Sequence, residues 1–164
     1  MVTRKSVLLA AAALVVLAVP SMAQGPFKYH AVTPCRVLDT RACATNGNAY
    51  QCGTGPSFGV KNYAIQGKCN VPQGATALTL NATVVTPTGD GYLTMWPFNA
   101  SEPLVSTLNY VNGDSAIANG AIVPLATIVT LGDNDLSVRI AAHAVNPNGS
   151  AYLVVDVTGY FATN

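Results

Sequence analysis

The stretch ATALTLNATVVT, residues Ala75–Thr86, alternates apolar and polar side chains. Successive side chains of a strand point to opposite faces of its sheet. The positions that share the apolar face are Leu78, Leu80, Ala82 and Val84, and those on the polar face are Thr79, Asn81 and Thr83. Alternation over this length predicts a half-buried antiparallel strand, with one face on a core and one toward water.

The same alternation recurs outward from this stretch, most clearly in Leu136–Ala144 and Ala151–Val157. Further candidate strands are Tyr29–Thr33, Phe58–Ile65, Gly91–Trp96, Leu104–Tyr110, Ile117–Val123 and Leu125–Leu131. Clusters of Pro, Gly, Asn and Asp separate them, as turns require. We therefore predict an all-β fold, an antiparallel β-sandwich or jelly-roll-like structure of about nine strands.

Composition agrees with strands and excludes one class of function. The chain has 20 Val and 16 Thr but a single Glu and four Lys, which favours strands over helices. Its 164 residues suit one domain. Only 9% of residues are charged, with a formal net charge of +1. Such a chain lacks the basic surface that holds a phosphate backbone, so nucleic acid is excluded as a partner.

The N-terminus has the pattern of an export signal. Arg4 and Lys5 precede the apolar run Val7–Val19, and the small residues of Ser21-Met22-Ala23 follow. The run is shorter than the ~20 residues of a membrane-spanning helix. We expect residues 1–23 to be a secretory signal peptide and residues 24–164 to form a single β-sandwich domain. We expect that domain to be secreted to the extracellular space or cell surface, without membrane insertion after signal cleavage.

Four cysteines, Cys35, Cys43, Cys52 and Cys69, lie close together in the exported part of the chain. An even number in an exported protein indicates disulfides, and none of the spacings is the C-x2-4-C pair of a zinc site. Three connectivities are possible. The turn-rich segment between Cys43 and Cys52 favours that pair, nested inside Cys35–Cys69, as a staple of the N-terminal third.

Arg36, Asp39 and Arg41 gather charge in a chain that has little of it. Regular alternation places Asp39 and Arg41 on one face of a strand and Arg36 on the other. One interpretation is a buried structural network that ties the first strand to the last through Asp156. The other is a binding site for a carboxylate or a sugar. We favour the structural interpretation and keep the three residues as candidate ligand-binding residues.

Tyr92, Thr94 and Trp96 share one face of a predicted strand. Two aligned aromatic rings can stack on sugar rings, which makes Tyr92 and Trp96 candidate ligand-binding residues. The competing interpretation, which we favour, is that these rings fill the core between two sheets. Leu93 and Met95 on the opposite face are also apolar, so either face could be the core.

No set of residues predicts catalysis. Gly55-Pro56-Ser57-Phe58-Gly59 matches G-x-S-x-G, but the strand–turn–helix context of a nucleophile elbow is missing. Neither His30 nor His143 has a neighbour that would orient its ring as a general base. We predict no catalytic residues and no enzymatic activity.

Four aspartates, Asp90, Asp114, Asp133 and Asp135, lie in predicted turns. Oxygen-rich turns can bind calcium, and Gly132-Asp133-Asn134-Asp135 is the best candidate. Aspartate also favours turns for its own hydrogen bonding, and that is the interpretation we adopt. We predict no cofactor and no metal site, with calcium as a weak alternative.

Several motifs together resemble a known module. They are TPCRVLDTR (residues 33–41), CNVP (69–72), LNATVV (80–85), GYLT (91–94), STLNY (106–110) with Ala118-Asn119, and DVTGYF (156–161). The set resembles a poorly characterised all-β module of secreted and surface bacterial proteins. The resemblance implies that Cys35 pairs with Cys69, whose counterparts occur in that family, and that Cys43 and Cys52 are additions. It carries over no catalytic residues.

We therefore expect a non-enzymatic secreted bacterial surface module that binds a surface or polysaccharide. The alternative is a self-assembling subunit of an extracellular layer or fibre. The uncharged segments Leu104–Tyr110 and Leu125–Leu131 could serve as open edges, and Gln24–His30 could add to a neighbour's sheet. The less favoured alternative is a small secreted hydrolase.

Overall fold

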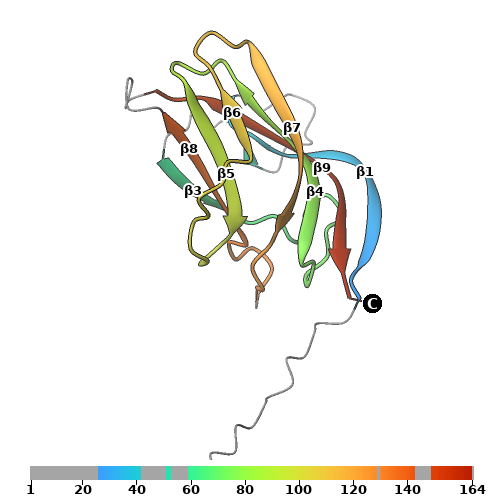
Figure 1. The fold of residues 1–164 in the computed structure, drawn as a ribbon. Helices are drawn as coiled ribbons and strands as arrows, with labels where there is room; N and C mark the ends of the chain where they lie inside the picture. The colour runs from blue at the N-terminus through green and yellow to red at the C-terminus, as the bar shows by residue number, and fades with distance from the viewer. Residues whose placement is uncertain (1–25, 42–50, 53–58, 129, 143–148, 164) are drawn as a thin grey trace, which may run out of the picture.

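The computed structural model describes residues 26–41, 51–52, 59–128, 130–142 and 149–163. All the regular elements of these ranges are strands (Figure 1). In chain order they are β1 (Lys28–Asp39), β2 (Gln51–Cys52), β3 (Gly59–Tyr63), β4 (Ala77–Val85), β5 (Gly91–Pro97), β6 (Leu108–Tyr110), β7 (Ala116–Pro124), β8 (Leu136–Ala142) and β9 (Tyr152–Ala162).

The strands form two packed sheets, which confirms the predicted all-β sandwich. One sheet has the order β2-β1-β9-β4-β7 and the other the order β3-β8-β5-β6. All pairings are antiparallel except the short contact between β1 and the two-residue β2. Apart from β2, eight strands of three residues or more remain, against the nine or so predicted.

The missing strand is Leu125–Leu131, which the sequence predicted wrongly. The backbone N–H of Leu125 bonds the carbonyl of Thr76, and that of Ala126 bonds the carbonyl of Asp135. These partners lie in two different loops, so no continuous ladder forms. Apolar side chains alone suggested a strand here. Leu104–Tyr110 is likewise mostly loop, with only its last three residues in β6.

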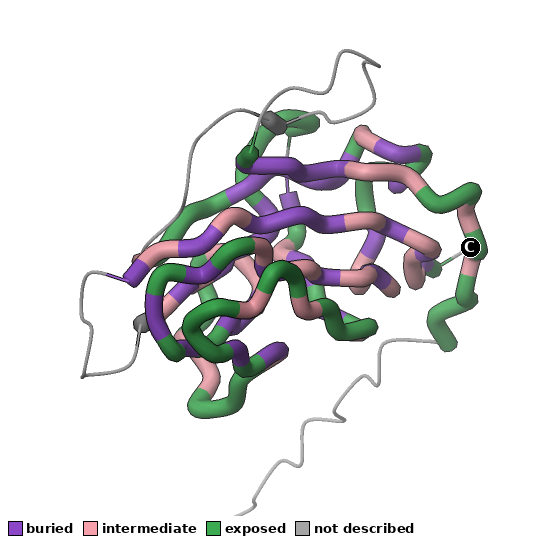
Figure 2. The backbone as a smooth tube through the Cα atoms, turned by 90° about the horizontal axis from the view of Figure 1, so that it is seen from above, coloured by how far each residue is buried: buried purple, intermediate pink, exposed green. Residues whose placement is uncertain are grey.

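The core lies between the sheets, and Figure 2 shows the alternation of buried and less buried positions along the strands. In β4 the predicted apolar face, Leu78, Leu80, Ala82 and Val84, is buried. Opposite it lie Leu93, Met95, Leu136, Val138 and Ile140 of the four-stranded sheet. Each buried Leu or Ile contributes roughly 1.5–3 kcal/mol, so this layer is the main source of stability.

The first and last long strands, β1 and β9, lie side by side in the five-stranded sheet. Lys28 of β1 lies opposite Ala162 of β9, and the pairing continues to Asp39 opposite Val154. Residues 28–30 therefore pair with β9 of their own sheet on one side, and the addition of Gln24–His30 to a neighbour's sheet stays a prediction. Gln24 lies outside the described residues, as does the predicted signal peptide.

The predicted disulfide between Cys35 and Cys69 is present, with their Cα atoms 5.6 Å apart. It links β1 to the loop before β4, which supports the N-terminal third as expected. The predicted Cys43–Cys52 bond cannot be placed in the same way, because Cys43 and the Cys52 side chain lie outside the described residues. Among those residues there is no helix with the length and hydropathy that a membrane crossing needs.

Each sheet has one glycine covered by a tyrosine ring. The Tyr29 ring lies over Gly159, where an added Cβ would come within 2.5 Å of ring atoms. In the other sheet Tyr110 lies opposite Gly91, whose added Cβ would meet the Ala141 carbonyl at 2.1 Å. The aromatic rings thus replace the side chains that these glycines lack.

Candidate functional site

A groove of about 510 Å³ crosses the outer face of the four-stranded sheet. The residues that line it come from three strands and from the loop between β5 and β6: Tyr92, Thr94, Glu102, Pro103, Leu104, Val105, Ser106, Asn109 and Arg139. We call this surface the β5 groove. Its floor faces away from the core, because Leu93 and Met95 on the opposite face of β5 belong to the core.

The loop that forms one wall of the β5 groove is fastened to the edge of β5. Thr107 donates its backbone N–H to the Leu93 carbonyl at 2.7 Å and accepts the N–H of Met95 on its hydroxyl at 3.1 Å. Thr94 Oγ1 lies 3.4 Å from the Val105 carbonyl. These bonds extend the sheet past the short β6 and fix the wall without covering the floor.

Tyr92 offers an accessible aromatic ring at the floor of the groove, with 36% of the residue exposed. Asn109 lies directly opposite it on β6 and is also exposed. Leu104 and Val105 stand at the wall with their side chains in solvent. The groove therefore combines an aromatic face, an amide and apolar side chains, which suits a ligand with both CH-rich faces and hydroxyls.

Arg139 of β8 and Glu102 of the loop form an ion pair inside the groove, with Nε 2.6 Å from Oε1. The hydrogen bond that Arg139 donates to Glu102 raises the pKa of Arg139, so the guanidinium stays charged. Within the described part of the chain, the two terminal nitrogens of Arg139 donate no hydrogen bond. They are available to an oxygen-rich ligand.

Trp96 does not join Tyr92 as an accessible aromatic strip. It lies on the same outer face of β5, but only 7% of it is exposed, and its Nε1 donates to the Ala100 carbonyl at 3.1 Å. The turn after β5 covers it. The favoured interpretation, that the Tyr92–Trp96 face lies between the sheets, is wrong, because Leu93 and Met95 are the core positions.

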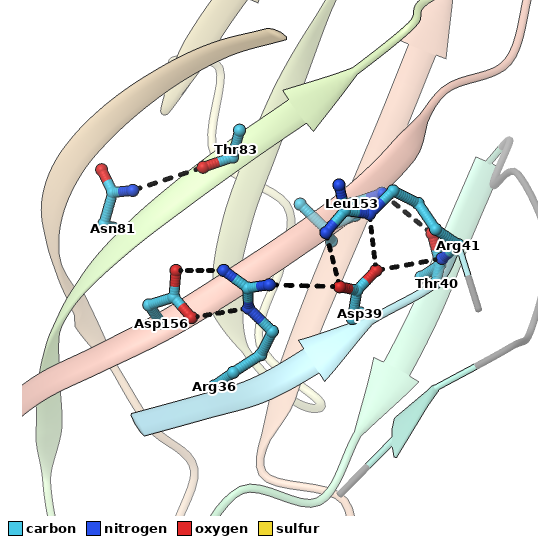
Figure 3. A network of polar contacts seen from close by, with 8 residues as sticks. All are labelled: Arg36, Asp39, Thr40, Arg41, Asn81, Thr83, Leu153 and Asp156. Carbon is cyan, nitrogen blue, oxygen red and sulfur yellow. Dashed lines mark hydrogen bonds and ion pairs between the residues drawn. The ribbon is translucent and has the colours of Figure 1, made fainter. Parts of the chain in front are cut away.

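Arg36, Asp39 and Arg41 lie on the other sheet, in an ion-pair network with Asp156 of β9 (Figure 3). Arg36 forms a forked contact with Asp156, Nε to Oδ1 at 2.9 Å and Nη2 to Oδ2 at 3.1 Å. Arg41 forms the same forked contact with Asp39, Nε to Oδ1 at 2.9 Å and Nη2 to Oδ2 at 2.7 Å. The predicted link from the first strand to the last through Asp156 is therefore present.

The third nitrogen of Arg36 joins the two halves of the network, with Nη1 3.4 Å from Asp39 Oδ2. This contact contradicts the prediction that Arg36 and Asp39 take opposite faces. The register between β1 and β9 shifts between Arg36 and Leu38, which marks a bulge. One extra residue in a strand reverses the alternation beyond it, so Arg36 and Asp39 come to share a face.

The network satisfies its own charges. The hydrogen bonds from Arg41 hold the pKa of Asp39 below its ordinary value, and those that Arg36 donates to Asp156 raise the pKa of Arg36. Two positive and two negative groups cancel, so the network has no net charge to attract an ionic ligand. The candidate residues thus fall into two separate places, Tyr92 in the β5 groove and the three charged residues in the network.

The four turn aspartates all accept backbone hydrogen bonds. Asp135 is buried and accepts the N–H groups of Ile65 and Gln66, at 3.0 and 2.7 Å. Burial raises the pKa of Asp135, while those two bonds act in the opposite direction. Asp135 therefore anchors the loop after β3, a structural role that accounts for its place in the fold.

The remaining catalytic candidates give no site in the described residues. The ring of His30 stacks on Tyr160, with centroids 4.9 Å apart, as part of the β1–β9 pairing. Ser57 and His143 lie outside the described residues. The strand predicted after the G-x-S-x-G motif is present as β3.

Comparison of the chain with protein-family models, with curated proteins and with solved structures found no match. Of the residues of the β5 groove, sequence analysis had singled out Tyr92 and Thr94; it missed Glu102, Asn109 and Arg139. Glu102 and Arg139 are isolated charges in two separate segments, and Asn109 is an ordinary polar residue of a strand, so none of the three belongs to a recognisable site motif.

Proposed function

We propose that this protein is a non-enzymatic, secreted bacterial surface module that binds polysaccharide in the β5 groove. The observation that carries the proposal is the exposed Tyr92 ring at the floor, between Asn109 and the Arg139–Glu102 pair. Sugars present apolar ring faces edged by hydroxyls. An aromatic face with an amide and a guanidinium around it can bind both parts.

The carboxylate content of the groove favours binding over hydrolysis. Most glycosidases use two carboxyl groups that flank the scissile bond. Among the described residues that line the groove, Glu102 is the one carboxylate, and it is paired with Arg139. A lone, ion-paired carboxylate holds a sugar hydroxyl more readily than it transfers a proton to a leaving group.

The fold and the N-terminus give weaker support. Consecutive strands pass repeatedly between the two sheets and β1 lies beside β9, as in a jelly roll, an architecture that includes lectin domains. This is an analogy at the level of fold. The predicted signal peptide, the Cys35–Cys69 bond and the resemblance to a bacterial surface module favour secretion.

The test is retention on insoluble cellulose, chitin, xylan and bacterial cell-wall sacculi, with the full chain expressed in an exporting host. We expect retention on at least one of them and at least a tenfold loss of affinity in Tyr92→Ala. The matched control is Tyr29→Ala, which removes an exposed tyrosine from the other sheet. Retention on none of the four, or equal retention of Tyr92→Ala and wild type, would contradict the proposal.

A further inference from the structure

The two sheets have four edges, and one of them differs from the rest. β6 is an edge of three residues, and β3 is an edge of five residues that includes the exposed Lys61. β2 pairs only with Leu38 and Asp39, so the rest of β1 is an edge as well, and it carries the charges of Lys28 and Arg36. β7 is an edge of nine residues, AIANGAIVP, without a charge. Natural edge strands are normally short or carry charge, because a free ladder pairs with other chains.

Two backbone bonds at the ends of β7 reveal which of its groups face the open side. The N–H of Thr86 donates to the carbonyl of Ser115, and that of Leu125 to the carbonyl of Thr76. Hydrogen-bonded pairs alternate along an antiparallel ladder, so every second residue of β7 turns its N–H and C=O away from β4. The outward-turned residues are Ala116, Ala118, Gly120, Ile122 and Pro124, and all five are exposed.

The edge is held in place and apolar. On the inner side of β7, Asn119 Nδ2 donates to the Thr107 carbonyl at 2.7 Å, which fastens the strand to the other sheet. On the outer side Ile122 is 65% exposed. Among the described residues only β4 hydrogen-bonds to the β7 backbone. The backbone N–H and C=O groups that turn away from β4 can therefore pair with another strand, and the exposed Ile122 side chain lies beside them.

We propose that β7 pairs antiparallel with β7 of a second copy of this chain, across a two-fold axis at Gly120. In this register Ala118 lies opposite Ile122 of the partner, and Ala116 opposite Pro124. All these residues turn their backbone groups outward, so the N–H groups of Ala116, Ala118, Gly120 and Ile122 each meet a carbonyl.

Charge and side-chain size agree with this register. Asp114, the charged residue nearest to β7 in the chain, lies opposite Ala126 of the partner, so no like charges meet. Ile122 gains the small side chain of Ala118 as its cross-strand neighbour, and the two Gly120 residues leave the axis open. Two five-stranded sheets join into one continuous sheet, and a symmetric contact of this type closes as a dimer.

The inference does not depend on polysaccharide binding, because the β5 groove lies on the other sheet. Sedimentation velocity on the full chain, expressed in an exporting host, is measured over a hundredfold concentration range. We expect a monomer–dimer equilibrium whose midpoint moves at least tenfold to higher concentration in Gly120→Lys, which places two like charges opposite each other. An added Cβ at Gly120 meets only the Leu80 carbonyl at 4.0 Å, so the fold accepts it.

Val60→Lys, on the edge strand β3, is the matched control and keeps the wild-type midpoint. A second variant, Gly120→Cys, is oxidised mildly and read on a non-reducing gel beside Val60→Cys. Residues opposite each other in a hydrogen-bonded pair have Cα atoms about 5.5 Å apart, within the range of a disulfide. A crosslinked dimer for Gly120→Cys alone supports the proposal even if Gly120→Lys fails to fold.

Three results would overturn the proposed contact. They are a monomer at every concentration, a dimer that Gly120→Lys leaves unchanged, and open-ended assembly in place of a dimer. Retention of Gly120→Lys on polysaccharide at the wild-type level separates the two proposals, since only the groove is needed there.

Discussion

The outer faces of the two sheets use arginine in opposite ways. On the five-stranded sheet, Arg36 places three nitrogens on Asp39 and Asp156, and Arg41 grips Asp39 from the other side. On the four-stranded sheet, Arg139 lines the β5 groove and meets Glu102 through Nε, while its terminal nitrogens donate no hydrogen bond to the described residues. In the first arrangement all three guanidinium nitrogens of Arg36 bind carboxylates of the fold. In the second, one nitrogen of Arg139 does so.

The comparison teaches how to tell a structural cluster of charges from a binding site. A short sequence such as Arg36 to Arg41 attracts attention because the charges are neighbours in the chain. Neighbours in the chain can also neutralise one another, as they do here. In the β5 groove the two charged residues, Glu102 and Arg139, come from a loop and a strand that are separate in the sequence, and they meet through one nitrogen of the guanidinium.

The largest expected effect on stability comes from replacing the two tyrosine-covered glycines, Gly91 and Gly159. In Gly91→Ala the added Cβ would lie 2.1 Å from the Ala141 backbone carbonyl, so the β5–β8 ladder has to move. In Gly159→Ala the clash is with the half-exposed Tyr29 ring, which can swing away. We expect losses of about 3 and about 1 kcal/mol in unfolding free energy, measured by urea denaturation. Equal losses would show that the two sheets do not differ in rigidity here.

The next effect compares the acidic partners of the arginines. Asp39→Asn removes charge from a carboxylate whose side chain is 5% exposed and which serves both Arg36 and Arg41. We expect a loss of about 2 kcal/mol in unfolding free energy. Glu102→Gln alters a partly exposed pair, and the expected loss is below about 0.5 kcal/mol. The reverse ranking would mean that the groove, and not the network, stabilises the fold.

At low pH, wild type and Asp39→Asn should have the same unfolding free energy. Since the pKa of Asp39 lies below its ordinary 3.8 in the folded protein, its contribution is complete above that pH and is lost as the pH falls. Asp135, whose pKa is raised by burial, acts in the opposite direction in both proteins, so it cancels. Denaturation curves at about pH 5 down to pH 2 should converge; a constant gap would contradict this assignment.

The smallest effect compares two tyrosines of the four-stranded sheet. Tyr110 is buried and donates to the Ala141 carbonyl at 3.0 Å, and burial raises its pKa to about 12. Tyr110→Phe should therefore cost about 1 kcal/mol in unfolding free energy. Tyr92→Phe, at the exposed floor of the groove, should be neutral within about 0.5 kcal/mol. A costly Tyr92→Phe would show that this ring supports the fold.

Sequence periodicity predicted most of the strands because a strand buried on one face alternates apolar and polar residues, as from Leu78 to Val84. It failed where another force set the conformation. The bulge beyond Arg36 has no side-chain signature, and the described residues of Leu125–Leu131 are mostly apolar but form no strand. The groove could not be predicted, because Tyr92, Glu102 and Arg139 are brought together only by the pairing of β5 with β8 and the path of one loop.

The pairing of β1 with β9 has a mechanical consequence. Lys28 and Ala162 lie side by side at one end of that ladder, so a load applied to both ends of the domain would break its hydrogen bonds one after another. Peeling of β1 would stop at Cys35, where the disulfide passes the force to the loop at Cys69. A protein tethered in this way would yield a short length of chain under weak tension and then resist, and would fully extend only once that bond is reduced.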